Sequence, residues 1–173
     1  MTWWIAAAIV AGPAWTMDVE MTSTAHLAPQ VLERAREEVT RIFADAGLVL
    51  RWTERTTTTG ATPRVRVNIV PQVLGYDRVS SPVMGVALRG ASGPIVQVFL
   101  KQVQNFARTY DVDLGAMLAH VIAHEIGHVL LPGKAHSSSG LMQAEWGKAV
   151  VRDASRGRLT FTETQAAKIR APH

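Results

Sequence analysis

Apolar and polar residues alternate in several short stretches of the chain, and a period of two predicts β-strands with one buried face. Strands are predicted for five stretches: residues 16–21, 48–52, 64–70, 83–88 and 94–100. The fourth lies in a region from 71 to 93 that contains several Gly, Pro and Ser residues, so we expect loops on both sides of it. Pro94 cannot donate a hydrogen bond to a neighbouring strand, which favours an edge position for the fifth stretch.

A second pattern places apolar residues three and four positions apart, as on one face of an α-helix. Three helices are predicted from it: one from Pro29 to Gly47, one from Asp111 or Asp113 to Pro132-Gly133, and one over residues 161–170. An Asp side chain can cap the second helix, and a glycine suits the end of the first. Thr160 and Glu163 have the spacing of a capping box ahead of the third. Residues 101–110 receive no assignment.

The order of these elements predicts the fold class. A strand and a helix are followed by several strands, then by a long helix, a loop and a last helix, which is too few helices for a doubly wound sheet. An α+β domain fits this order better. The chain has 173 residues, enough for one sizeable core, and it shows no repeat or linker, so residues 15–173 are predicted to form a single domain.

Residues 1–14 have the composition of a signal peptide. Trp3 to Ala11 is a run of nine apolar residues, and the small residues Gly12-Pro13-Ala14 follow it. The run is shorter than the about 20 residues that cross a bilayer, so stable membrane insertion is not expected. We predict a secreted or periplasmic protein. No Lys or Arg precedes the run, which a start site placed too late, or a first strand in place of a signal, would explain. The alternative location is the cytoplasm.

Charge and cysteine content narrow the kinds of site that the chain can contain. The net charge is +4, and Lys and Arg are scattered rather than clustered, which favours a basic soluble surface over nucleic-acid binding. The chain has no cysteine, so disulfides and thiolate ligands are excluded. Any transition-metal site must therefore use His and carboxylate groups.

Residues 120–142 contain four of the chain's six histidines. His124 and His128 are four residues apart, so on a helix their imidazoles share one face and can point at one cation. Glu125 is rotated by about 100° from His124, where it can reach a water molecule beside the cation but cannot easily be a third ligand. This His-Glu-x-x-His arrangement is a signature of zinc peptidases and predicts Zn²⁺ as the cofactor.

A catalytic zinc ion usually has three protein ligands and one open position, so another residue must complete the site. His136 follows the predicted helix end in a loop of small residues and is our candidate for the third ligand. His120 lies on the same helical stripe, but three successive turns span about 12 Å, too far for one ion with bonds of about 2.0–2.1 Å. We interpret His120 as a core histidine, or as a residue that supports the ligands from outside.

Hydrolysis of a peptide bond is the reaction expected of such a site. Zinc lowers the pKa of water toward about 7 and polarises the scissile carbonyl, while Glu125 takes up a proton and then delivers it to the leaving amine. The partner would be a peptide or protein substrate. The alternative hypothesis is a zinc-binding protein with a binding or structural role and no hydrolytic activity.

The motif residues resemble the metzincin branch of the zincin metallopeptidases, which share this helix, a third ligand from a loop and a turn that contains methionine. The matching residues here are His124, Glu125, His128, His136 and Met142. The chain departs from the longer metzincin pattern His-Glu-x-x-His-x-x-Gly-x-x-His. Leu131 stands at the position of its glycine, and Lys134 stands at the position of its third histidine.

The chain is more similar to exported bacterial matrixin-like proteins, which contain "AHSxxGLM" and end in a helix with "LxFTxxQA". These motifs occur here at residues 135–142 and 159–166. The resemblance implies a zincin fold, with a twisted mixed sheet packed on an N-terminal helix and the zinc helix, plus a C-terminal helix. It also implies a cleft beside an edge strand, formed by 94–100 or 83–88, that can pair with an extended peptide. Met142 would be a structural residue beneath the metal.

Overall fold

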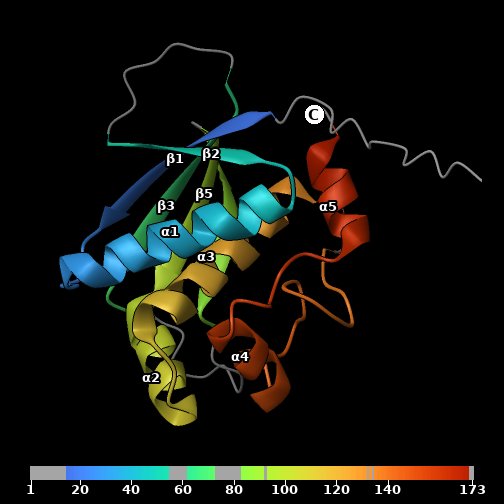
Figure 1. Cartoon of the computed structure of the whole chain (residues 1–173). Coiled ribbons are helices and arrows are strands. Elements are labelled where there is room, and N and C mark those ends of the chain that lie inside the picture. The colour runs from blue at the N-terminus through green and yellow to red at the C-terminus, as the bar shows by residue number, and fades with distance from the viewer. Residues whose placement is uncertain are drawn as a thin grey trace, which may run out of the picture.

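A computed structural model describes residues 15–54, 62–72, 83–91, 93–131, 133 and 135–171. Its elements in chain order are β1 (Thr16–Ser23), α1 (Pro29–Asp45), β2 (Val49–Thr53), β3 (Arg64–Val70), β4 (Gly85–Gly90), β5 (Gly93–Phe99), α2 (Leu100–Tyr110), α3 (Leu114–Leu130), α4 (Lys148–Ser155) and α5 (Glu163–Arg170) (Figure 1). A mixed sheet with helices packed against it confirms the predicted α+β class.

The described strands form one sheet in the order β2-β1-β3-β5-β4. β1, β2, β3 and β5 pair in parallel, whereas β4 runs antiparallel to β5 and forms an edge. The prediction that the strand beginning at Pro94 is an edge strand is therefore wrong. Pro94 is tolerated because it lies at the start of β5, opposite Arg89, where little of the ladder depends on its missing N–H. The edge beside β5 is supplied by β4, which overlaps the predicted strand 83–88, the alternative edge strand.

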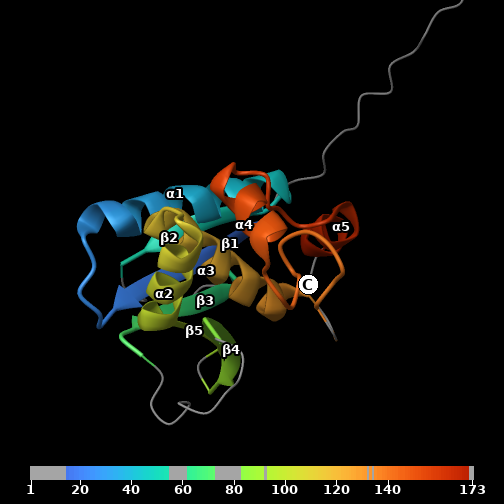
Figure 2. The ribbon, with the colours of Figure 1, turned by 90° about the horizontal axis from the view of Figure 1, so that it is seen from below.

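Helices α1 and α3 lie on the same face of the sheet (Figures 1 and 2). The alternation along β3 explains this choice of face. Val65, Val67 and Ile69 are fully buried, and the residues between them are half-buried. Because successive strand residues point to opposite faces, the apolar face of the sheet is the one that the helices cover.

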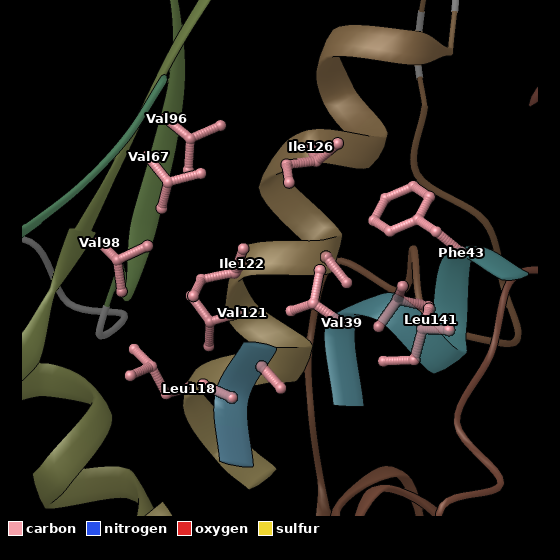
Figure 3. Close-up of a cluster of buried hydrophobic side chains, with 14 of the residues drawn as sticks. Val39, Phe43, Val67, Val96, Val98, Leu118, Val121, Ile122, Ile126 and Leu141 are labelled. Carbon is pink, nitrogen blue, oxygen red and sulfur yellow. The ribbon is translucent and has the colours of Figure 1, made fainter. Parts of the chain in front are cut away.

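Helix α3 lies in the middle of the hydrophobic core (Figure 3). Buried side chains flank it on both sides: Val67, Val96 and Val98 of the sheet on one, and Val39, Phe43 and Leu141 on the other. Burial of each such side chain contributes about 1.5–3 kcal/mol before the loss of conformational entropy is counted. This two-sided packing fixes the helix that carries the histidine motif.

Two of the helices were not predicted. For two others, the structure shows which residue caps the N-terminus. The missed helices are α2, which follows β5 directly, and the eight-residue α4. Asp113, one of the two proposed caps, caps α3. The capping box of the last helix consists of Thr162 and Gln165, so the predicted pair of Thr160 and Glu163 is wrong by two residues.

Two of the predicted features lie wholly or partly outside the described residues. These are the predicted signal peptide, residues 1–14, and Pro132 of the predicted turn. Helix α3 ends at Leu130, and Gly133 has a positive φ of 69°, which suits a turn. None of the helices in the described part of the chain has the length and apolar character needed to span a membrane.

Replacement of Gly127 by alanine tests how closely α3 approaches the segment that carries Met142. A β-carbon at position 127 would lie 2.5 Å from Met142 Sδ and 3.0 Å from Phe161 Cε1. Alanine usually stabilises a helix by up to about 1 kcal/mol relative to glycine. Here we expect Gly127→Ala to lower the free energy of unfolding by about 1–3 kcal/mol in urea denaturation, because both neighbours are buried.

Gly147 provides the control, because a β-carbon there would have no atom within 4 Å. Gly147→Ala should change the free energy of unfolding by less than about 1 kcal/mol. A Gly127→Ala protein as stable as the wild type would show that Met142 repacks without cost.

Candidate metal centre

Three histidines from two segments come together beside the sheet edge. His124 and His128 project from adjacent turns of α3, and His136 belongs to the loop after that helix. One ring nitrogen of each histidine lies within 4.8 Å of those of the other two. The structure therefore brings together the three residues that were predicted as metal ligands.

The separation of the His124 and His128 ring nitrogens fits two ligands of one tetrahedral metal ion. Two nitrogens bound to one tetrahedral zinc at about 2.0–2.1 Å lie about 3.3 Å apart. The Nε2 atoms of His124 and His128 are 3.1 Å apart. The Nδ1 atom of His124 is 2.9 Å from the carbonyl oxygen of Leu141. With Nδ1–H as donor to this carbonyl, the lone pair of Nε2 is left to face the other two imidazoles.

Burial keeps two of these imidazoles in the neutral form that binds metals. It is the main cause that lowers the pKa of His124 to about 4. The nearby His128 and His136 also lower this pKa, and the hydrogen bond to Leu141 opposes them. Burial and the neighbouring His136 likewise lower the pKa of His128. Metal binding by these two residues at neutral pH therefore does not require the release of a proton from either ring.

Glu125 lies on α3 next to His124 and packs against the edge strand β4. Its side chain is 7% exposed, and burial raises its pKa to about 7. A β-carbon at position 85 would lie 2.8 Å from Glu125 Cγ and 3.1 Å from its Cδ. Gly85 therefore makes the space that this carboxyl group occupies. Gly85 was not predicted to matter, although a glycine inside an apolar strand often marks a close approach.

Trp146 packs against His124, and Met142 packs against α3 at Gly127, the residue before His128. Met142 is fully buried, and the absence of a side chain at Gly127 allows its sulfur to approach the helix. Trp146 lies edge-on to His124, with ring centroids 5.7 Å apart, and its Nε1–H donates to the carbonyl of Gln143. Trp146 was not predicted, because a lone tryptophan after the motif gives no signal of its own.

A cleft of about 800 Å³ opens over the histidines and Glu125. The edge strand β4 and helix α3 both line it, and α2 contributes the aromatic rings of Phe106 and Tyr110. Leu88 of β4 is 46% exposed and lines the same cleft. The cleft therefore combines an exposed strand edge, apolar side chains and the histidine cluster.

His120 lies apart from this cluster and faces α1. It is fully buried, and its Nδ1 is 2.7 Å from the carbonyl oxygen of Ala116. Its Nε2 lies 3.8 Å from Glu38 Oε1 and makes no hydrogen bond to a described residue. Burial is the main cause that lowers its pKa. This environment matches the interpretation of His120 as a core histidine.

Removal of single histidines should separate ligands from neighbours. We expect about one zinc ion per chain in the wild type, and loss of that zinc on dialysis for His124→Ala, His128→Ala or His136→Ala. His120→Ala should keep its zinc, because this ring faces α1. His26→Ala, at an exposed position, is the matched control. Zinc content measured by atomic emission decides, and zinc retained by His136→Ala would remove His136 from the site.

Glu125 should make the stability of the metal-free protein depend on pH. Its pKa is about 7 in the folded protein, against 4.5 as the ordinary value. The folded protein binds the Glu125 proton more tightly than the unfolded chain does. The stability that this provides is fully present below pH 4.5 and is lost as the pH rises through about 7. Glutamine cannot ionise, so Glu125→Gln should gain stability over the wild type across this range, by up to about 3 kcal/mol.

Urea denaturation in the presence of a chelator, at several pH values from 4.5 to 8, measures this difference. Glu37→Gln, which replaces an exposed glutamate of α1, is the control. A stability difference between Glu125→Gln and wild type that stays constant with pH would contradict the prediction.

Comparison with known proteins does not assign a function to this site. No protein-family model matches the chain, and no curated protein matches it. The features that bear on function are three converging imidazoles, a buried carboxyl group beside them and a cleft along a strand edge.

Proposed function

We propose that this chain is a zinc-dependent endopeptidase with a zincin fold. The observation that carries the proposal is the convergence of the three histidines beside Glu125 at the base of a cleft. A mixed sheet with one antiparallel edge strand and two helices on one face supports the fold assignment. The thiol-free composition of the chain is consistent with a site made of imidazoles and a carboxylate.

Glu125 is the proposed general base. Zinc bound by the three imidazoles would lower the pKa of water and polarise the carbonyl group of a bound peptide. Glu125 accepts the proton of the attacking water on its carboxylate and delivers it to the nitrogen of the leaving amine. Burial raises the pKa of Glu125 to about 7 in the metal-free protein, and a bound cation would favour the carboxylate form that accepts the proton.

The edge of β4 is the proposed binding surface for the substrate backbone. β4 pairs with β5 on one side, and on its other side it lines the cleft next to Glu125. An extended peptide can add to such an edge through main-chain hydrogen bonds, with alternate side chains in pockets. Leu88, Phe106 and Tyr110 offer apolar contacts for those side chains. The substrate is therefore proposed to be a peptide or unfolded protein segment in extended form.

Glu125→Gln should separate catalysis from metal binding. Cleavage of an unfolded protein or a peptide library should fall by about 10²–10⁴-fold, because amide nitrogen and oxygen cannot take up the proton. The zinc content should stay at the wild-type level, because the three imidazoles are unchanged. Glu37→Gln should cleave at the wild-type rate, and a chelator should abolish cleavage until zinc is added back.

Two results would count against this proposal. Cleavage by Glu125→Gln at the wild-type rate would exclude Glu125 as the base. Stable zinc binding by the wild type without cleavage of any peptide in a broad library would favour the alternative of a zinc-binding protein without hydrolytic activity.

A further inference from the structure

The loop that carries His136 is contacted by a buried glutamine of the C-terminal helix. Gln165 Nε2 donates to the hydroxyl oxygen of Ser137 at 3.0 Å and, over a longer distance of 3.4 Å, to the carbonyl oxygen of Ala135. These two acceptors belong to the residues immediately before and after His136. Gln165 therefore holds the chain on both sides of this histidine.

The other end of the same amide group belongs to the cap of α5. Gln165 Oε1 accepts a hydrogen bond from the backbone N–H of Thr162 at 3.0 Å, and the Thr162 hydroxyl accepts one from the backbone N–H of Gln165 at 3.3 Å. A backbone N–H can only donate and a carbonyl can only accept, so these partners fix the orientation of the amide. The side chain is 7% exposed and uses its oxygen and both amide hydrogens.

His136 needs an external restraint more than the other two histidines do. His124 and His128 are fixed by a buried helix, and His124 also bonds to Leu141. His136 is exposed and lies outside helices and strands. A ligand on a loop stays within the small tolerance of a metal site only when neighbouring groups hold its backbone.

We propose that Gln165 is a positioning residue for His136, so that α5 sets the affinity of the metal centre without contacting the metal. The inference rests on the metal centre proposed above. It also gives a role to the glutamine of the "LTFTETQA" segment, which the proposed reaction does not use. An amide is required at this position, because one end must accept from the helix cap while the other end donates to the loop.

Gln165→Glu is the decisive variant, because it removes the donor and keeps the acceptor. Glutamate is a regular partner in a capping box, so α5 remains capped, but a carboxylate would face the carbonyl oxygen of Ala135. We expect Zn²⁺ affinity, measured by competition with a chromophoric chelator, to fall by about 10–100-fold. Ser137→Ala removes one acceptor of Gln165, together with the hydrogen bond from the Ser137 hydroxyl to the carbonyl of Ser139, and should weaken Zn²⁺ binding in the same direction by a smaller factor.

Thr162→Ala is the matched control, because it removes the hydroxyl of the cap and leaves both donors of Gln165 in place. It should lower the melting temperature and change Zn²⁺ affinity by less than about two-fold. In a His136→Ala background, Gln165→Glu should weaken Zn²⁺ binding no further, because the ligand that Gln165 positions is already absent. An equal loss in both backgrounds would overturn the role proposed for Gln165.

Hydrogen exchange in the metal-free protein supplies a readout that is independent of metal. The N–H of Ser137 donates to the carbonyl of Met142, and this bond should open faster in Gln165→Glu than in the wild type. Unchanged exchange together with unchanged Zn²⁺ affinity would overturn the inference while the metal centre stands. Equal Zn²⁺ affinity of wild type and His136→Ala would instead overturn the metal centre, and exchange would still decide whether Gln165 restrains the loop.

Discussion

Helix α3 packs against the sheet on one side and against α1 on the other, and 13 of its 17 residues are buried. This packing stabilises the core, and it also sets the protonation of the groups that the helix carries. Removal from water disfavours a charge of either sign, so it lowers the pKa of His124 and raises the pKa of Glu125. One constraint, the burial of a single helix, therefore favours both the neutral imidazole of His124 and the protonated form of the Glu125 carboxyl group.

A single helix cannot complete the metal centre. The turn before His124 carries His120, which faces α1, so a third imidazole has to come from the loop after the helix. The backbone of that loop is held by the C-terminal segment. Leu141 donates its N–H to the carbonyl of Thr160, and its own carbonyl lies against His124. The described residues after 158 therefore contact the loop that carries His136 and do not line the cleft.

Most of the sheet and the metal cluster could be predicted from the sequence, because both follow from local spacing. Alternation predicted the strands, and the four-residue step between His124 and His128 predicted the two helical histidines of the proposed metal centre. The spacing of Leu100, Val103 and Ala107 also contained the signal for α2, but the strand before it runs into the helix without a turn residue. The edge position assigned from Pro94 failed because a proline at the start of a strand is compatible with an interior position.

Other features depend on contacts between distant segments and left little local signal. Gly85 matters because Glu125 packs against it, and Gln165 matters because the His136 loop reaches it. The capping box was misplaced by two residues because Thr160 and Thr162 offer the same pattern, and the helix begins directly after Thr162. A nearby cation favours the ionised form of a carboxyl group, so ionisation of Glu125 and loading of the three imidazoles favour each other. In the proposed mechanism Glu125 consequently becomes a base when the metal centre is complete, and the metal-free protein avoids an unpaired buried charge.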